Sequence, residues 1–244
     1  EMDLRNILER SSARETAARV ACGALTKQLL SSFGIKLQSR IISVGEVNVY
    51  DTKLSKEAKE AIDKARADGD SLGGIFEVKA LNVPAGLGSH VEYDRKLDAA
   101  IAAAFMSIQA IKAVEIGAGI KAARRRGSEL HDEIFYKNGK IIRSSNNAGG
   151  IEGGISNGEP IVVRAALKPI ATLKIPLRSI NVKTKKAAMA HVERMDVCAI
   201  ESAAVIGESV LAFELAKAFL EKFGGDSLKE VTAHFKASKQ IQVI

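Results

Sequence analysis

The spacing of hydrophobic and polar positions predicts a chain of helices and strands in irregular alternation. Apolar residues three and four apart predict helices that begin near Ser12, Ser55, Tyr93 and Ala199. Runs rich in β-branched residues predict strands at 35–50, 75–83, 111–116, 140–143, 161–166 and 171–175. Several of these strands follow one another through glycine turns with no helix between them. The pattern therefore favours an α+β fold with antiparallel sheets over a doubly wound parallel sheet.

The first long helix is predicted to start at Ser12, with Glu15 completing a capping box, and to end at Gly34. Its expected buried stripe comprises Ala17, Val20, Ala21, Ala24, Leu25 and Leu29. Arg10 and Arg14 flank the helix start, where free N–H groups favour an anion. Two interpretations stay open: an anion site, or a capped core helix with two exposed arginines.

The last long helix is predicted at 199–223 and ends at the glycine pair 224–225. Its expected buried side comprises Ala203, Ile206, Val210, Phe213, Ala216 and Leu220. The remaining residues, to Ile244, are expected to form a polar tail, and residues 120–138 are expected to be mostly loop.

A glycine-rich run at 146–158 precedes the predicted strand at 161–166. Its glycines are Gly149, Gly150, Gly153, Gly154 and Gly158. Glycine permits positive φ and a close approach to bare backbone, so either a ligand or another stretch of backbone could face these residues. The run is not a dinucleotide fingerprint, because a strand and not a helix follows it, and it is not a P-loop, because it lacks Gly-Lys-Ser/Thr.

Composition narrows the possible functions. The chain has 244 residues, 46% hydrophobic and 27% charged, and no linker is evident, so we expect one domain spanning 1–244. The formal net charge is +7, but aromatic residues are only 5%, which favours an anionic small substrate over a nucleic acid. Two cysteines and widely separated histidines predict a reducing, cytoplasmic location and no metal site. No apolar run is long enough for a membrane span.

Several motifs occur in one register along nearly the whole chain. They are DLRNILERSSARETAAR at 3–19, GDSLGG at 69–74, PAGLGSH at 84–90, KAVEIG at 112–117, NNAGGIEGGISNG at 146–158, Lys168-Pro169 and Arg194-Met195-Asp196. In these segments the chain resembles chorismate synthase.

The resemblance implies the last step of the shikimate pathway, which leads to the aromatic amino acids. In that step 5-enolpyruvylshikimate 3-phosphate loses phosphate and a ring proton by 1,4-anti elimination to give chorismate. It also implies dependence on reduced FMN, an association with NADP, a cytoplasmic homotetramer, and a β-α-β sandwich with helices packed between antiparallel sheets. Neither nucleic acid nor membrane is an expected partner.

The resemblance also implies roles for individual residues. The FMN contacts would be Arg10, Ser11, Ser12, Gln109, Ala110, Gly153, Lys168, Pro169, Ile170, Ala171, Thr172 and Arg194. Arg14 and Arg194 would bind the substrate's phosphate and carboxylates, and Asp196 would act with the flavin in removing the proton. The alternatives are that Asp196 only pairs with Arg194 and that Lys168 is a solvated strand end.

Chorismate synthases carry a further N-terminal portion before the segment that starts at Asp3. That portion holds two histidines that act as proton donors and several arginines that bind substrate. If the 244 residues are the whole polypeptide, we expect an incomplete active site and little turnover. The alternative is a non-catalytic fragment that keeps only flavin-binding or assembly surfaces.

Overall fold

A five-stranded antiparallel sheet forms the centre of the protein. The computed structural model describes residues 4–137, 139–192 and 196–241. The sheet has the strand order β2-β1-β3-β9-β4. Its members are β1 (Lys36–Val44), β2 (Val47–Asp51), β3 (Gly74–Leu81), β4 (Ile111–Ile116) and β9 (Ile161–Leu167). Every neighbouring pair is antiparallel, as the glycine-turn pattern predicts.

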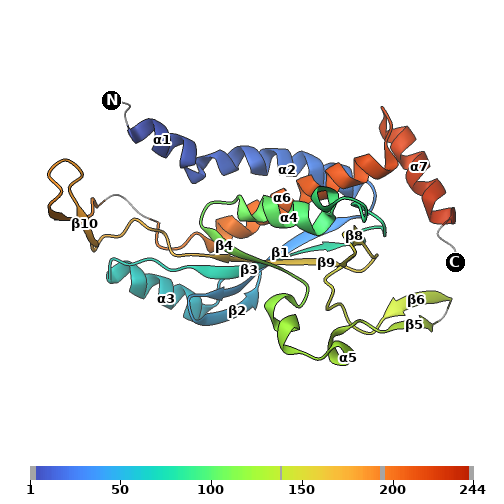
Figure 1. Cartoon of the computed structure of the whole chain (residues 1–244), viewed down its shortest axis with the longest axis horizontal. Helices are drawn as coiled ribbons and strands as arrows, with labels where there is room; N and C mark the ends of the chain where they lie inside the picture. Colours follow the sequence, from blue (N-terminus) through green and yellow to red (C-terminus); the bar gives the residue numbers. More distant parts are fainter. Residues whose placement is uncertain (1–3, 138, 193–195, 242–244) are drawn as a thin grey trace.

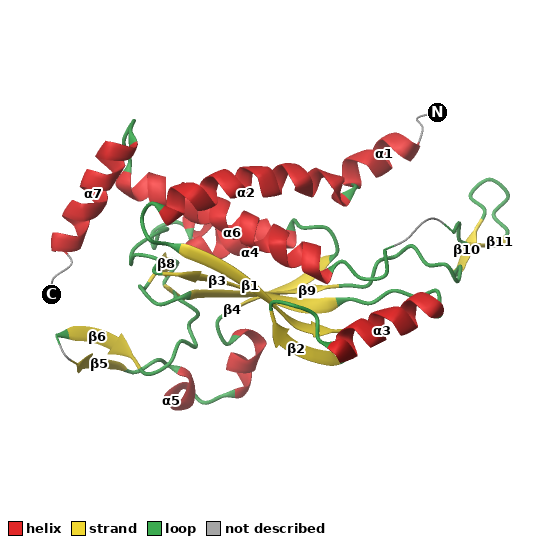
Figure 2. Cartoon of the chain, turned by 180° about the vertical axis from the view of Figure 1, so that it is seen from behind, coloured by secondary structure: helices red, strands yellow, loops and turns green. Residues whose placement is uncertain are grey.

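Three helices cover one face of this sheet: α2 (Thr16–Ser31), α4 (Leu97–Met106) and α6 (Ile200–Phe223) (Figure 1). The central helix α6 packs on β1 and β3 and lies between the sheet and α2. A Cβ at Gly207 of α6 would lie 2.5 Å from the Phe76 ring, so this glycine lets the helix approach the sheet closely. On the opposite side, α3 (Lys56–Ala67) packs near β2 (Figure 2).

The hydrophobic core lies between the sheet and the helical layer. Its largest fully buried side chains are Phe76, Phe105, Phe219, Leu30, Ile35, Ile41, Leu87, Leu97, Ile101, Ile161, Ile200 and Leu211. These residues come from strands and helices far apart in the sequence, so the core depends on the complete arrangement of layers.

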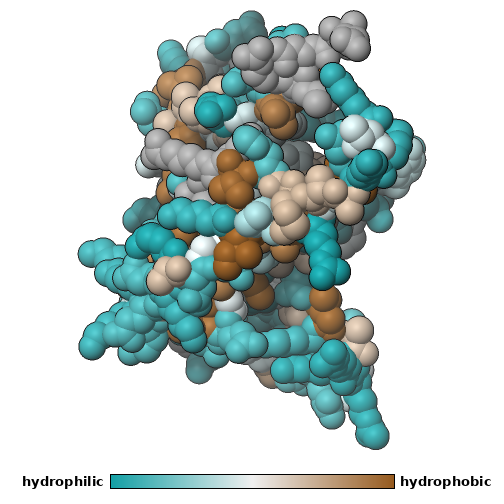
Figure 3. All heavy atoms as spheres, turned by 90° about the vertical axis from the view of Figure 1, so that its left-hand side faces the viewer, coloured by the Kyte–Doolittle hydropathy of each residue, from teal (hydrophilic) through white to brown (hydrophobic). Residues whose placement is uncertain are grey.

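Smaller elements extend from this body. The helical ones are α1 (Leu4–Ser11), η1 (Ala13–Glu15), η2 (Tyr93–Arg95), η3 (Gly119–Arg124), α5 (Gly127–Leu130) and α7 (Leu228–Ile241). Three two-stranded sheets pair β5 (Ile134–Lys137) with β6 (Lys140–Arg143), β7 (Ile151–Glu152) with β8 (Ile155–Ser156), and β10 (Arg178–Ile180) with β11 (Ala187–Met189). The end of the molecule that carries β10 and β11 exposes hydrophobic residues among hydrophilic ones (Figure 3).

The buried stripe expected on α2 is wrong for most of its residues: Val20 and Leu29 are half-buried, but the others are exposed. Ala17, Ala21 and Ala24 are exposed, and the Leu25 side chain is 68% exposed. The helix instead turns Gly23 and Leu30 inward, because Gly23 allows α2 to cross Ser209 of α6 at close range. The outer surface of the helical layer is therefore apolar, which is the face that a sandwich architecture would cover.

Other expected elements also differ. No strand forms at 171–175, and the tail after Gly225 contains α7, which buries Val231 and Phe235 against the core. The expected loop at 120–138 contains η3, α5 and β5. On α6, Phe213 is 50% and Leu220 41% exposed, so these two residues lie off the buried face, which includes Leu211, Leu215 and Phe219.

The predicted α+β class, with antiparallel sheets packed against helices, is confirmed. Within the described residues, the helical layer has a large sheet on one side only. A single domain over 1–244 stays a prediction. None of the helices described here is both long and apolar enough to span a membrane.

Candidate functional site

Five of the predicted site residues, Gln109, Ala110 and residues 168–170, lie at the end of the sheet where β9 finishes. The Lys168 amide donates to the Ala110 carbonyl at 2.9 Å, and this joins the segment after β9 to the connection between α4 and β4. The Ser71 hydroxyl donates to the Ile170 carbonyl at 2.6 Å. The Leu72 amide donates to the Val197 carbonyl at 2.8 Å, which brings in the segment before α6. The folded chain therefore places Ala110, residues 168–170 and the neighbour of Asp196 side by side.

The turn before β3 makes this approach possible. A Cβ at Gly73 would lie 2.2 Å from the Leu167 carbonyl oxygen, closer than real atoms approach. Glycine is therefore required where Gly73 passes the end of β9.

Ala110 has a backbone φ of 66°, in the left-handed region. An alanine in this region is strained, and such residues gather at sites where the surrounding structure fixes the backbone. The hydrogen bond from Lys168 holds its carbonyl. Its neighbour Gln109 presents a side-chain oxygen, Oε1, that is buried and has no hydrogen-bond partner among the described residues. An orphaned acceptor beside a strained backbone fits a site that binds a ligand with an N–H donor, as the imide of a flavin has.

Glu15 links the start of α2 to this site. One carboxylate oxygen accepts a hydrogen bond from Gln109 Nε2 at 2.8 Å, and the other accepts one from Arg19 Nε at 2.9 Å. These two hydrogen bonds lower the pKa of Glu15, and the bond from Arg19 has the larger effect. The predicted capping box is therefore wrong: Ser12 Oγ accepts from the Arg14 amide, and the Glu15 side chain is engaged elsewhere.

The arginines at the helix start are open to solvent. Arg10 and Arg14 are exposed, and among the described residues the Arg14 guanidinium contacts Glu9 at 3.5 Å and Ser12. Ser11 lies at the end of α1, with its hydroxyl donating to the Ile7 carbonyl at 3.0 Å. Arg14 is the sequence neighbour of Glu15, whose side chain contacts Gln109. The anion-site interpretation stays a prediction.

The glycine-rich run mostly faces backbone. A Cβ at Gly149 would lie 2.3 Å from the Gly117 nitrogen, one at Gly150 would lie 2.6 Å from the Pro160 carbonyl oxygen, and one at Gly154 would lie 2.6 Å from the Ser89 carbonyl oxygen. The close-approach interpretation therefore holds for these three residues.

Gly153 differs from its neighbours. Its Cβ position is open, it is exposed, and its φ of 60° suits the tight turn between β7 and β8. However, the amide of Leu97, the first residue of α4, donates a hydrogen bond to the Gly154 carbonyl. Gln109 lies beyond the other end of α4, which finishes at Met106. The 10 residues of α4 separate these points by about 15 Å. A flavin contact at Gly153 stays a prediction, and the structure places it apart from the others.

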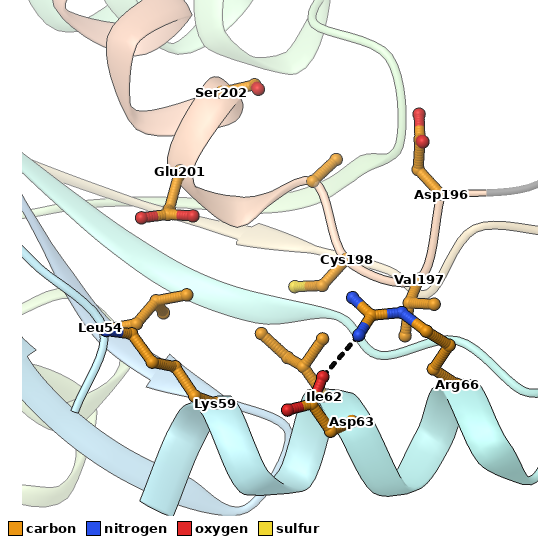
Figure 4. Close-up of a pocket in the computed structure, with 11 residues that line it drawn as sticks. Leu54, Lys59, Ile62, Asp63, Arg66, Asp196, Val197, Cys198, Glu201 and Ser202 are labelled. Carbon is orange, nitrogen blue, oxygen red and sulfur yellow. Dashed lines mark hydrogen bonds and ion pairs between the residues drawn. The ribbon is translucent and has the colours of Figure 1, made fainter. Parts of the chain in front are cut away.

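Asp196 borders a cavity of about 600 Å³ between α3 and the start of α6 (Figure 4). Arg66 and Asp63 form an ion pair on its wall, and the Asp196 carboxylate points away from that pair. Asp196 is exposed, so it is free to meet a ligand. Arg194 lies outside the described residues, so both its predicted contacts and its pairing with Asp196 stay predictions.

The remaining predicted contacts extend away from the sheet. Lys168 and Pro169 are exposed, and Ala171 and Thr172 follow in a segment that returns to Gly69, where the Lys174 amide donates to the Gly69 carbonyl at 3.0 Å. Among the described residues, no group of three or more acidic, histidine or cysteine side chains is arranged to hold a metal ion.

Two side-chain contacts in this region were not predicted from the sequence. Asp132 accepts hydrogen bonds from the amides of Asn147 at 2.7 Å and Ala148 at 2.9 Å, which fixes the start of the glycine-rich run. Glu15 was assigned to a helix cap and instead contacts Gln109. Local spacing offers no signal for either contact, because each joins residues distant in the sequence.

The structure defines a mixed α+β protein in which several predicted site residues gather at one end of the sheet, and known proteins share the fold. The family model described as chorismate synthase matches residues 1–220. The chain therefore belongs to the chorismate synthase family.

Individual relatives agree. The chorismate synthase of Geobacter sulfurreducens is 53% identical over 263 residues, covering 96% of this chain and 67% of the relative. That of Aquifex aeolicus is 52% identical, covering 96% and 66%. A solved crystal structure of a chorismate synthase superposes with a TM-score of 0.85 at 46% identity, covering all of this chain and 74% of that one. The chain thus spans about two thirds of the length of these curated relatives.

Proposed function

We propose that this protein catalyses the formation of chorismate from 5-enolpyruvylshikimate 3-phosphate with reduced FMN bound. The C–O bond to phosphate and a ring C–H bond break, a C=C bond forms, and inorganic phosphate and a proton leave. Membership of the family supports the reaction. The observation that carries the proposal for this chain is the meeting of Gln109, Ala110 and residues 168–170 at one end of the sheet.

The proposed roles follow from the chemistry of each group. Gln109, Ala110 and the segment from Lys168 to Thr172 would hold the flavin, together with Arg10, Ser11 and Ser12. Arg14 and Arg194 would bind the phosphate and carboxylates of the substrate, since guanidinium groups pair with both. Asp196 would accept the proton. Reduced FMN, when bound, would supply electron density to the departing phosphate.

A homotetramer in the cytoplasm belongs to the same proposal. The apolar outer surface of the helical layer supports an assembled state, because large exposed apolar patches are unusual on isolated proteins. The second candidate is a non-catalytic fragment that retains flavin-binding or assembly surfaces. The chain spans about two thirds of the length of its curated relatives.

Chorismate formation, followed by absorbance under anaerobic conditions with reduced FMN, tests the proposal on this chain alone. We expect little turnover in the wild-type chain and a further loss of at least about 100-fold in Asp196→Asn, since removing a proton acceptor forfeits general base catalysis. FMN binding should be unchanged in that variant. If the wild type binds FMN but forms no chorismate, the non-catalytic candidate replaces the proposed one.

A further inference from the structure

The orientation of the Gln109 amide is set by a charged neighbour. Gln109 Nε2 lies 2.8 Å from Glu15 Oε1. An ionised carboxylate only accepts hydrogen bonds, so the amide must turn its NH₂ group toward Glu15. Turning the amide over would bring two oxygen atoms together. The charge on Glu15 therefore decides that the Gln109 amide directs its nitrogen toward Glu15 and its oxygen away from Glu15.

The Glu15 carboxylate is itself held in place and kept ionised. Arg19 approaches both of its oxygens, with Nε 2.9 Å from Oε2 and Nη2 2.8 Å from Oε1. Arg19 is anchored in turn by Ser107, whose Oγ accepts from Nη1 at 2.7 Å. The first turn of α2 is thus fastened to the end of α4, just before Gln109.

The oxygen that this network directs has no partner in the described part of the chain. Gln109 Oε1 is buried and accepts no hydrogen bond there. Buried acceptors are nearly always satisfied, so this atom calls for a donor from elsewhere. Ala110, adjacent to it, bonds to Lys168 at the proposed flavin site. A planar heterocycle with an N–H flanked by carbonyls would supply the donor.

We propose that Glu15 is a positioning residue for the cofactor: its charge fixes Gln109 so that Oε1 accepts a hydrogen bond from the imide N–H of the flavin. This inference rests on the proposed function, because it takes FMN as the ligand. Glu15 itself does not touch the ligand. It acts only through the orientation of Gln109.

Exchanging the two side chains tests this assignment. Oxidised FMN is titrated into the wild type, Glu15→Gln, Gln109→Glu and the double variant Glu15→Gln/Gln109→Glu, with Kd and the position of the flavin's visible absorption band as readouts. Glu15→Gln removes the charge and frees the amide to turn, so we expect Kd to rise roughly five- to tenfold with a shifted band. Gln109→Glu opposes two carboxylates and should bind more weakly still. The double variant restores one donor facing one carboxylate and leaves an outward acceptor, so Kd should return to within about threefold of the wild type.

The matched control is Glu60→Gln, the same substitution on the exposed surface of α3, where the Glu60 carboxylate lies 3.7 Å from Lys56 Nζ. It should change neither Kd nor the band. Melting temperatures measured without flavin distinguish an effect on the positioning of Gln109 from an effect on the stability of the fold. If the double variant regains its melting temperature but not its affinity or band, Glu15 is merely structural and the inference is wrong. If the wild type binds FMN and Glu15→Gln binds equally well, the inference alone fails. A wild type that binds no FMN would overturn the proposed function together with it.

Discussion

Glu77, in the middle of β3, is a fully buried carboxylate held by three cations. Its Oε1 lies 2.8 Å from Arg40 Nε and 3.5 Å from Lys79 Nζ, and its Oε2 lies 2.8 Å from Arg164 Nε. Burial favours the neutral acid, but Arg40, Arg164 and Lys79 outweigh it, so the pKa of Glu77 is lowered. The strand register places Arg40 opposite Glu77, and Arg164 opposite both Glu77 and Glu115. Opposite charges therefore alternate across four strands.

Removing the charge of Glu77 should cost much more than removing an exposed charge. We expect Glu77→Gln to lower the free energy of unfolding by about 3 kcal/mol, because Arg40, Lys79 and Arg164 would then face one another without a counterion. Urea denaturation measures this. Glu60→Gln, which breaks an exposed pair with Lys56, should change it by under about 1 kcal/mol. Equal effects of the two substitutions would contradict the argument.

At the scale of elements, positions with strong local signals were predictable. The strand predicted at 111–116 is β4, and the helix predicted at 199–223 is α6, which begins one residue later. Both predictions succeeded because the apolar periodicity of these segments is unbroken. The helix α7 was missed although Ser227 and Glu230 form a capping box, with the Ser227 amide 3.0 Å from Glu230 Oε2. The inward face of α2 could not be predicted, since a glycine at a helix crossing carries no hydrophobic signal.

At the crossing of α2 and α6, we expect a Gly→Ala substitution to have the opposite effect on stability from the one it has in an exposed helix. In an exposed helix, Gly→Ala stabilises by about 0.5–1 kcal/mol. At Gly23 a Cβ would lie 2.3 Å from Ser209 Cβ, so we expect Gly23→Ala to destabilise by about 1–3 kcal/mol through overpacking. Thermal unfolding followed by circular dichroism measures this. Combining it with Ser209→Gly should recover part of the loss, and a stabilised single variant would show that the helices can separate freely.

For the whole molecule, the buried carboxylates predict an acid limit to stability. The pKa of Asp132 is lowered as well: burial raises it, but hydrogen bonds from Ala148, Ser145 and Asn147 outweigh that effect. A carboxyl with a lower pKa in the folded state stabilises the fold above its unfolded pKa, and this stability is lost as pH falls through the folded pKa. We therefore expect the free energy of unfolding to decline below about pH 4, near the unfolded values for Asp and Glu.

Denaturant titrations at a series of pH values measure this decline. The Glu77→Gln variant should show a shallower decline than the wild type, because it lacks one of the responsible groups. Identical slopes for the two proteins would mean that other carboxyls set the acid limit.

The site was predictable from sequence to a limited extent. Family motifs pointed to Gln109, Ala110 and Lys168, and the structure brings these together. The sequence could not show that Gly153 lies at the other end of α4, nor that Glu15 faces Gln109, because both depend on how distant segments pack.

The packing of Gly149 against Gly117 has a consequence for identifying such chains. The most distinctive motif of this sequence is constrained by contact between two stretches of its own backbone, with the Gly149 Cβ position 2.4 Å from Gly117 Cα. A substitution there is excluded by folding, whatever the protein binds. A search with this motif would therefore retrieve every chain that builds this loop, including any that has lost catalysis.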